Sequence, residues 1–206
     1  MKTVFFDLDG TIIDSFGGFK DAILHAVQVF GHKPDDVFIR SGQGPPLRDT
    51  FERLGIDDIE EAVRLYRERY TTRSYKEHPV FPGVDELLQR LNADGVRLFV
   101  ATSKPTAISV KILEHLELAH FFDKIVGATM DASRDAKIDV LRYAMAQAGN
   151  PDGATMVGDR KFDVEAGNEL GLRSIGVTWG GADRPELVAA QAHHIVDTVE
   201  ELSSLL

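Results

Sequence analysis

The chain has 206 residues, with 43% hydrophobic and 27% charged residues, which is ordinary for one globular domain with or without a smaller insertion. Its 33 acidic and 23 basic residues give a formal net charge of −10, which argues against a nucleic-acid polymer as partner, because such partners need a basic face. The absence of cysteine excludes a thiolate nucleophile, a cysteine zinc site and an iron–sulfur cluster.

The first predicted element is a buried strand over residues 3–7, which runs directly into Asp7, Asp9 and a Gly-Thr pair. Because side chains alternate along an extended chain, the two aspartates point the same way. Two carboxylates that close repel each other unless a proton or a cation lies between them. The segment "VFFDLDGT" therefore indicates a metal, a shared proton, or both.

The apolar run before Asp7 is far shorter than a signal peptide, and no segment approaches the roughly 18 apolar residues of a membrane span. We therefore expect a cytoplasmic protein with no membrane association.

The next part of the chain contains helical patterns and no evident strand. Three helices are predicted there, at 16–30, 46–54 and 58–74. Three helices are too many for a single crossover between strands, so residues 15–80 are predicted to be an inserted helical subdomain. Residues 1–14 and 81–206 would then form the core, and the segment "HPVFPG" marks the exit from the insertion.

Strands and helices alternate in the rest of the chain. Further buried strands are predicted at 96–102, 124–128, 154–158, 173–178 and 194–196. Helical patterns lie between them at 84–95, 107–122 and 137–149, and the first and last of these stop at Gly95 and Gly149. Alternation of this kind predicts an α/β fold, with a mostly parallel sheet and helices on both faces.

Polar residues collect where the predicted strands end. In open parallel sheets, ligands bind at the carboxyl ends of the strands. The residues at these positions are Asp7, Asp9, Thr102, Ser103, Lys104, Asp159 and Asp163, and Lys137 opens a helix nearby. Pro105 is expected at the first position of the following helix. Taken singly, the hydroxyls could be capping residues and Lys137 a surface lysine. Together, carboxylates for Mg²⁺, hydroxyls for phosphate oxygens and a lysine suit phosphoryl transfer.

Four segments in this order, "FFDLDGTIIDS", "VATSKP", Lys137 and "MVGDRKFD", resemble the four motifs of the haloacid dehalogenase-like superfamily. The resemblance spans the whole chain. It implies a Rossmann-like parallel sheet with strand order 5-4-1-2-3, and it implies that residues 15–80 are an α-helical cap.

The resemblance also implies roles for the matched residues. Asp7 would be the nucleophile that forms an aspartyl-phosphate. Asp9 would be the general acid toward the leaving group and then the general base toward water. Thr102, with the amide of Ser103, would bind phosphate, and Lys137 would brace the phosphate and Asp7.

The implied cofactor is Mg²⁺, held by Asp7, Asp159 and the carbonyl of Asp9, with Asp163 in support through water or a hydrogen bond. Many relatives have proline after the motif-three lysine, whereas this chain has isoleucine after Lys137. Lys104 is therefore retained as the alternative bracing lysine.

The predicted function is a Mg²⁺-dependent phosphatase of small phosphomonoesters, similar to the phosphoglycolate phosphatase and 5′-nucleotidase-like members of the superfamily. A sugar-phosphate mutase of the same superfamily is the main alternative, and a phosphoacceptor signalling domain is a second. Asp9 argues against a dehalogenase, because dehalogenases lack an acid there. The substrate would be a small molecule, and the protein would be a monomer or a homodimer.

Substrate specificity is expected to come from the cap. The segment "IRSGQGPPLRDTF" (39–51) is the candidate, because its glycines and prolines predict a shaped loop before a helix. Arg40 and Arg48 flank this loop and are the candidate specificity residues, although arginines are mostly solvent-exposed.

Overall fold

The computed structural model describes residues 2–43, 47–129, 133–181 and 183–206. The chain folds into two compact units. One, here called the sheet unit, comprises Met1–Asp14 and Val80–Leu206, and the other, the helical unit, is Ser15–Pro79. Among the described helices, none combines the length and apolar character that a membrane crossing needs.

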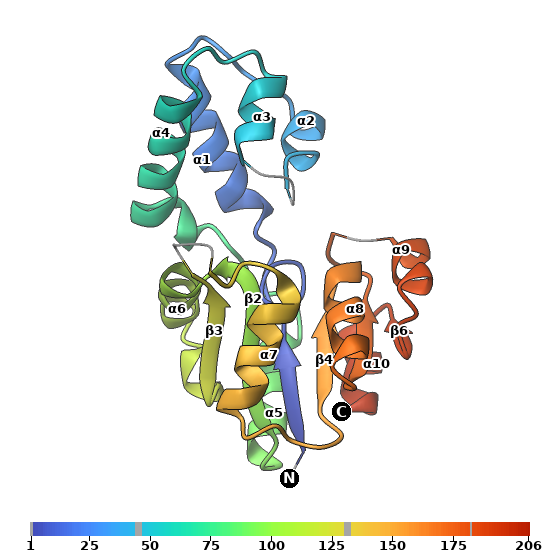
Figure 1. The fold of residues 1–206 in the computed structure, drawn as a ribbon. Coiled ribbons are helices and arrows are strands. Elements are labelled where there is room, and N and C mark those ends of the chain that lie inside the picture. The colour runs from blue at the N-terminus through green and yellow to red at the C-terminus, as the bar shows by residue number, and fades with distance from the viewer. Residues whose placement is uncertain (1, 44–46, 130–132, 182) are drawn as a thin grey trace. The chain divides into compact units, whose positions relative to one another are not determined.

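The sheet unit is built on a six-stranded sheet in which every neighbouring pair of strands is parallel (Figure 1). The strands are β1 (Thr3–Phe6), β2 (Arg97–Pro105), β3 (Lys124–Ala128), β4 (Thr155–Gly158), β5 (Arg173–Val177) and β6 (His194–Val196). Their order is β3-β2-β1-β4-β5-β6. The predicted α/β class is confirmed. Read from the other edge, the first five strands follow the order 5-4-1-2-3, and β6 extends the sheet beyond β5.

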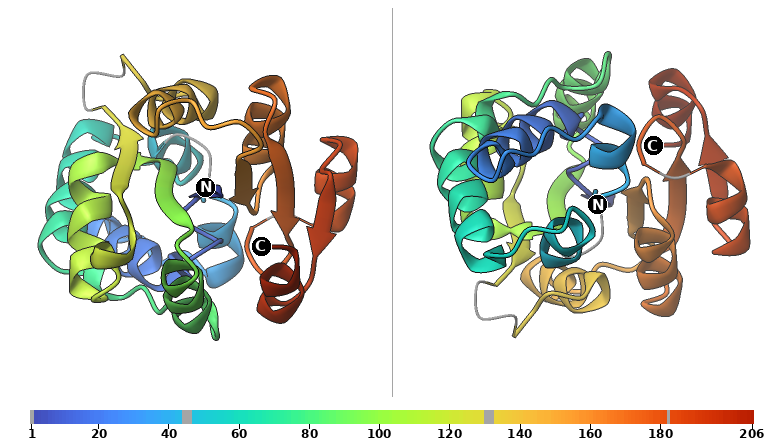
Figure 2. Two further views of the ribbon diagram at one scale, coloured as in Figure 1. Left: turned by 90° about the horizontal axis from the view of Figure 1, so that it is seen from below. Right: turned by 90° about the horizontal axis from the view of Figure 1, so that it is seen from above.

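Helices cover both faces of this sheet. They are α5 (Val84–Ala93), α6 (Thr106–His115), α7 (Lys137–Gln147), α8 (Lys161–Glu169), α9 (Arg184–Ala189) and α10 (Val199–Leu205), with a short 3-10 helix, η2 (Ala119–Phe121). Helices α7 and α8 lie on one face, and α5 and α10 lie on the other (Figure 2). The predicted stops at Gly95 and Gly149 are confirmed, since these glycines adopt φ of 73° and 81° just beyond α5 and α7.

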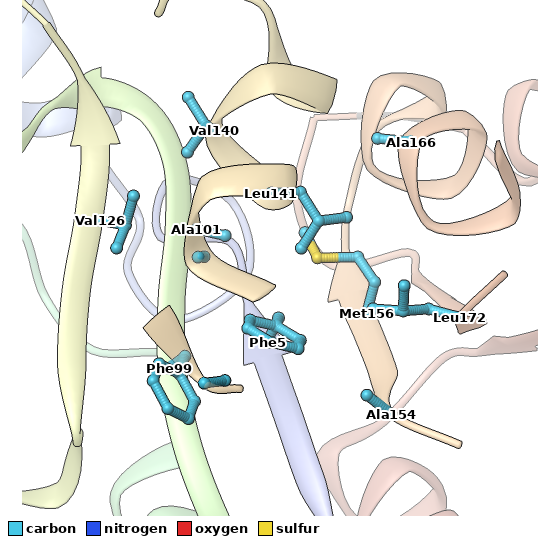
Figure 3. Close-up of a cluster of buried hydrophobic side chains, with 12 residues drawn as sticks. Phe5, Phe99, Ala101, Val126, Val140, Leu141, Ala154, Met156, Ala166 and Leu172 are labelled. Carbon is cyan, nitrogen blue, oxygen red and sulfur yellow. The ribbon is translucent and has the colours of Figure 1, made fainter. Parts of the chain in front are cut away.

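An apolar layer joins α7 and α8 to the sheet (Figure 3). Phe5 of β1 and Phe99 of β2 lie with ring centroids 5.3 Å apart, and Val140 and Leu141 of α7 belong to the same buried cluster. Burying a side chain of this size contributes roughly 1.5–3 kcal/mol. This packing fixes α7, whose first residue is Lys137, against the central strands.

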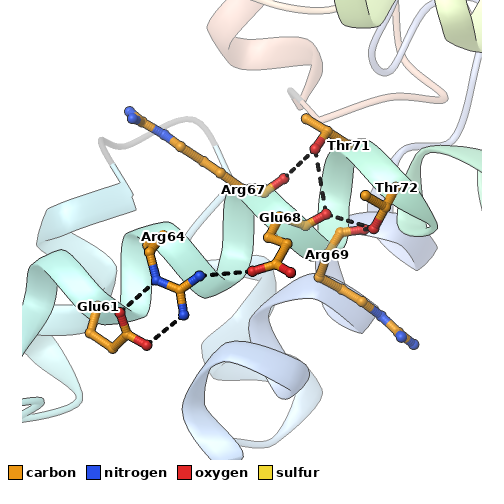
Figure 4. Close-up of polar contacts among 7 residues, drawn as sticks. All are labelled: Glu61, Arg64, Arg67, Glu68, Arg69, Thr71 and Thr72. Carbon is orange, nitrogen blue, oxygen red and sulfur yellow. Dashed lines mark hydrogen bonds and ion pairs between the residues drawn. The ribbon is translucent and has the colours of Figure 1, made fainter.

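The helical unit consists of α1 (Phe16–Gln28), α2 (Asp36–Arg40), α3 (Leu47–Arg53), α4 (Ile59–Thr72) and the 3-10 helix η1 (Ser74–Lys76). Its apolar core includes Ile23 and Phe51, which are fully buried. The outer face of α4 is charged: Arg64 bonds Glu61 at 2.7 Å and Glu68 at 2.8 Å (Figure 4). Such pairs, three and four residues apart, stabilise a helix by only a few tenths of a kcal/mol, roughly 0.2–0.5 each.

Some predicted boundaries were wrong. The short helix α2 was not predicted: it ends at Arg40, within the segment 39–51, and Asp35 caps its start by accepting the N–H of Phe38. The predicted helical pattern 107–122 ends early, at His115, since Glu117 adopts a φ of 59°. Pro105 lies just before α6 rather than at its first position. Residues 44–46, which include the predicted start of one helix, lie outside the described residues.

Candidate active site

Asp7 lies at the carboxyl end of β1, the strand between β2 and β4. Its backbone N–H donates to the carbonyl of Val157 on β4 at 2.9 Å, so the sheet holds its main chain in place. The residue is only 7% exposed. Beyond it the chain turns through Gly10, which has a φ of 79° and whose N–H donates to the carbonyl of Ile13 at 2.9 Å.

Three buried acids meet at the ends of β1 and β4. Carboxylate oxygens of Asp7, Asp159 and Asp163 all lie within 4.8 Å of one another, and Asp159 and Asp163 are 2% and 1% exposed. Within the described residues, this group of acids does not include Asp9. Its Oδ2 instead lies 3.1 Å from Nζ of Lys104. The Asp9 carboxylate thus contacts a lysine of its own, Lys104.

Lys137 is the cation at the centre of this group. Its Nζ lies 2.6 Å from Oδ1 of Asp7 and 2.6 Å from Oδ1 of Asp163, and it donates to the carbonyl of Ala101 at 2.9 Å. Lys137 is 9% exposed as a whole residue, so these contacts are shielded from water. Of the two lysines considered from the sequence, Lys137 therefore contacts Asp7 and Lys104 contacts Asp9.

Burial and crowding shift the proton affinities of the site. Burial raises the pKa of Asp7 to about 6: Lys137 opposes the rise, and the charges of Asp163 and Asp9 add to it. Burial, followed by the charges of Asp163 and Asp7, raises the pKa of Asp159 well above its ordinary value. Burial acts to lower the pKa of Lys137, but Asp163 and Asp7 outweigh it and raise that pKa. One lysine thus does not offset three buried acids.

The arrangement fits a hard divalent cation. Oδ1 of Asp159 is buried and has no hydrogen-bond partner among the described residues. A buried carboxylate oxygen without a partner is costly unless a proton or a cation lies beside it. Carboxylate oxygens are the ligands that Mg²⁺ prefers. Both oxygens of Asp163 are engaged, Oδ1 by Lys137 and Oδ2 by the N–H of Arg160 at 3.0 Å, whereas Lys137 contacts only Oδ1 of Asp7. Asp7 and Asp159 are therefore the candidate side-chain ligands.

The loop after β5 also contacts the site, and this contact was missed from the sequence. The N–H of Gly181 donates to Oδ2 of Asp159 at 2.5 Å. A Cβ added at Gly180 would lie 2.4 Å from the same oxygen, so only glycine allows this approach. The sequence signal that could have indicated this contact is the "WGG" segment, which directly follows the predicted strand 173–178.

The predicted phosphate-binding residues follow on β2. Thr102 is 1% exposed, and its Oγ1 accepts the N–H of Lys104 at 3.3 Å. Ser103 is exposed. Val100 is in register with Phe6, so Thr102 and Asp7 come from neighbouring strands at the same edge of the sheet.

The two candidate specificity arginines have partners inside the helical unit. Cζ of Arg40, the last residue of α2, lies 3.6 Å from the centroid of the Phe16 ring. Arg48, in the first turn of α3, forms an exposed ion pair with Glu60. Neither contact bears on which substrate the protein takes.

Known proteins resemble this chain over most of its length. The family model of haloacid dehalogenase-like hydrolases matches residues 4–177. A 5′-nucleotidase from Pseudomonas aeruginosa is 33% identical over 98% of this chain and 94% of its own length. The crystal structure of a predicted phosphatase from Clostridium acetobutylicum is similar with a TM-score of 0.86 and 38% identity, covering 99% of this chain and 97% of that one.

The tyrosine-protein kinase PtkA from Mycobacterium tuberculosis is 38% identical over 87% of this chain. The chain spans 62% of the length of that relative, which is less than two thirds.

Proposed function

Because this chain belongs to the haloacid dehalogenase-like hydrolases, we propose that it is a phosphatase that hydrolyses a small phosphomonoester with Mg²⁺ through an aspartyl-phosphate on Asp7. The observation that carries the proposal is the buried contact of Lys137 with Asp7, beside Asp159 and Asp163. We take phosphoglycolate or a nucleoside 5′-monophosphate as the substrate class, in line with the 5′-nucleotidase among the relatives.

In the first step, a carboxylate oxygen of Asp7 attacks phosphorus and the bond from phosphorus to the alcohol oxygen breaks. Asp9 gives its proton to the departing oxygen, so the alcohol leaves neutral. Lys137 holds the Asp7 carboxylate in place and offsets charge as the two anions approach each other.

In the second step, Asp9 takes a proton from water, and that water attacks the phosphorus of the aspartyl-phosphate. The bond from phosphorus to the Asp7 oxygen breaks, which returns Asp7 as a carboxylate and releases inorganic phosphate. The hydroxyl of Thr102 and the N–H of Ser103 would hold phosphate oxygens through both steps.

Mg²⁺ would be held by Asp7, Asp159 and the main-chain carbonyl of Asp9, with Asp163 supporting them. When bound, it supplies positive charge that lets an anionic nucleophile approach an anionic phosphate. The surplus of buried acid over lysine supports this assignment.

The proposal is tested by assaying phosphoglycolate, nucleoside 5′-monophosphates and sugar phosphates with Mg²⁺. We expect release of inorganic phosphate that is lost in excess chelator and almost completely lost in Asp7→Asn, whose amide cannot form an acyl phosphate. Beryllium fluoride should bind next to Asp7 as a mimic of the phosphorylated state. Hydrolysis that persists in Asp7→Asn would contradict the covalent mechanism, and isomer exchange without phosphate release would indicate a mutase.

We further propose that the helical unit reads the substrate through Arg40 or Arg48. Replacing the arginine that contacts the substrate with alanine should raise KM for the natural substrate. Turnover of a small aryl phosphate should change little, since that compound offers no polar group beyond the phosphate. Arg64→Ala, which removes exposed ion pairs on α4, is the matched control. Unchanged kinetics for both Arg40→Ala and Arg48→Ala would place the specificity residues elsewhere.

A further inference from the structure

Glu186 lies on α9, beyond residues 4–177 that the family model matches. Its Oε1 accepts two hydrogen bonds from the loop that follows β4: from Nε of Arg160 and from the backbone N–H of Lys161, both at 2.9 Å. The Glu186 side chain is 24% exposed and that of Arg160 is 34% exposed, so water screens this contact only in part.

The two donors to Glu186 lie between the acids of the candidate site. Arg160 follows Asp159 directly, and its backbone N–H donates to Oδ2 of Asp163 at 3.0 Å. Lys161 is the first residue of α8, where a backbone N–H has no partner within the helix. One oxygen of Glu186 therefore fixes both the side chain and the main chain of the segment that carries Asp159 and Asp163.

The chain leading into α9 reinforces this arrangement. The N–H of Gly181 donates to Oδ2 of Asp159, and Asp183 accepts the N–H of Glu186 at 3.0 Å. The second bond caps α9 and fixes the main chain from which Glu186 reaches the loop. The segment before α9 and α9 itself thus contact the Asp159 loop at separate points, one at a carboxylate and one at the helix start.

We propose that Glu186 is a positioning residue for the metal-binding acids, acting through Arg160 and Lys161 to hold Asp159 and Asp163 in place. Like charges within 4.8 Å of one another tend to move apart, so the loop must be fixed before a cation arrives if binding is to be tight. In the described residues, the Glu186 side chain bonds Arg160 and Lys161 and forms no hydrogen bond or ion pair with Asp159 or Asp163. The inference rests on the Mg²⁺ site of the proposed function.

The test measures metal binding directly, with Mn²⁺ as the probe and the full chain in the absence of substrate. Free Mn²⁺ is followed by its electron paramagnetic resonance signal, and Mg²⁺ is added as competitor. Residues that orient metal ligands typically contribute roughly 10- to 100-fold in affinity, so we expect Glu186→Ala to weaken Mn²⁺ binding about 10-fold. Glu186→Gln should lose only about 2-fold, because its amide oxygen still accepts the N–H of Lys161.

Arg184→Ala is the matched control, since it removes an exposed ion pair to Asp197 from the same helix without touching the Asp159 loop. We expect wild-type affinity in this variant. Equal Mn²⁺ affinity in wild type and Glu186→Ala would overturn the positioning role and leave the metal site standing. Absence of Mn²⁺ binding in the wild type would overturn the metal site itself. If Glu186→Ala shows no cooperative thermal unfolding, it is not folded and the test rests on Glu186→Gln. Full wild-type Mn²⁺ affinity in Glu186→Gln, in place of the expected 2-fold loss, would then overturn the positioning role.

Discussion

The two lysines near the site contact different aspartates of the "DLD" segment. Nζ of Lys137 lies 2.6 Å from Asp7, and Nζ of Lys104 lies 3.1 Å from Asp9. Each carboxylate thus has its own lysine neighbour, and in the proposed reaction the two have separate tasks: attack on phosphorus by Asp7 and proton transfer by Asp9. Lys104, which the sequence left as the alternative to Lys137, therefore contacts Asp9, the proposed proton-transfer residue.

At this scale we predict that Asp9→Asn loses most activity on substrates with poor leaving groups. General acid catalysis contributes roughly 10²–10⁴-fold, and an activated aryl phosphate needs less of it than an alkyl phosphate. Lys104→Met should show a smaller loss with the same preference for alkyl substrates, because it acts through Asp9. Single-turnover phosphorylation is the measurement, since it isolates the leaving-group step from water attack. Equal losses on alkyl and aryl substrates would contradict the assignment.

Among the elements, helices α1 and α4 of the helical unit are joined by an ion pair between Arg69 and Asp21. Arg69 donates from Nε and Nη2 to the two carboxylate oxygens of Asp21, at 2.8 and 2.9 Å, and Oγ of Ser74 donates to Oδ2 at 2.5 Å. The Arg69 hydrogen bond lowers the pKa of Asp21 from 3.8 to about 2; partial burial opposes it and Ser74 assists it. A bidentate pair of this kind fixes the two helices in one register.

We predict that Asp21→Asn destabilises the protein by about 1 kcal/mol near neutral pH, a value reduced for the partial exposure of the carboxylate. The folded pKa lies below the unfolded one, so this stability is present above about pH 4 and is lost as the pH falls toward about 2. Thermal unfolding of both proteins across this range is the measurement. Lys20→Ala, which removes an exposed pair to Asp36, should cost less. A difference that does not depend on pH would refute the prediction.

For the whole molecule, the buried acids make stability depend on pH. The pKa of Asp7 is raised from 3.8 to about 6, so its protonated form is favoured in the folded state. The stability that this form contributes is complete below about pH 4 and is lost as the pH rises through about 6. A cation bound to the folded state alone would restore stability by mass action.

We therefore predict that the metal-free protein loses about 1–3 kcal/mol of unfolding free energy as the pH rises from about 4 to about 7. Mg²⁺ should raise Tm more at about pH 8 than at about pH 5, since more carboxylate is ionised at the higher pH. Without metal, Asp7→Asn should match or exceed wild-type stability at about pH 8, because its amide carries no charge. Differential scanning calorimetry measures all three effects. If Mg²⁺ leaves the Tm of the wild type unchanged at both pH values, the prediction is contradicted.

The sequence by itself determined the α/β class, the order of the strands along the chain and the residues that reach the carboxyl edge of the sheet. These depend on local signals: buried runs such as residues 3–7, glycines such as Gly95 and Gly149 beyond helix ends, and acids directly after strands. The same residues carried the resemblance to the haloacid dehalogenase-like family, which the family model confirms over residues 4–177.

Only the tertiary structure decided which of these residues touch. The resemblance implied Lys137 as the lysine beside Asp7 and left Lys104 as the alternative; the structure decides for Lys137, which reaches Asp7 across 130 positions of sequence because α7 packs on the central strands. The contacts of Gly181 with Asp159 and of Glu186 with the Asp159 loop likewise join β4 to the chain after β5. A periodic pattern reports which face of an element is buried, whereas the partner of a polar side chain depends on how separate elements pack.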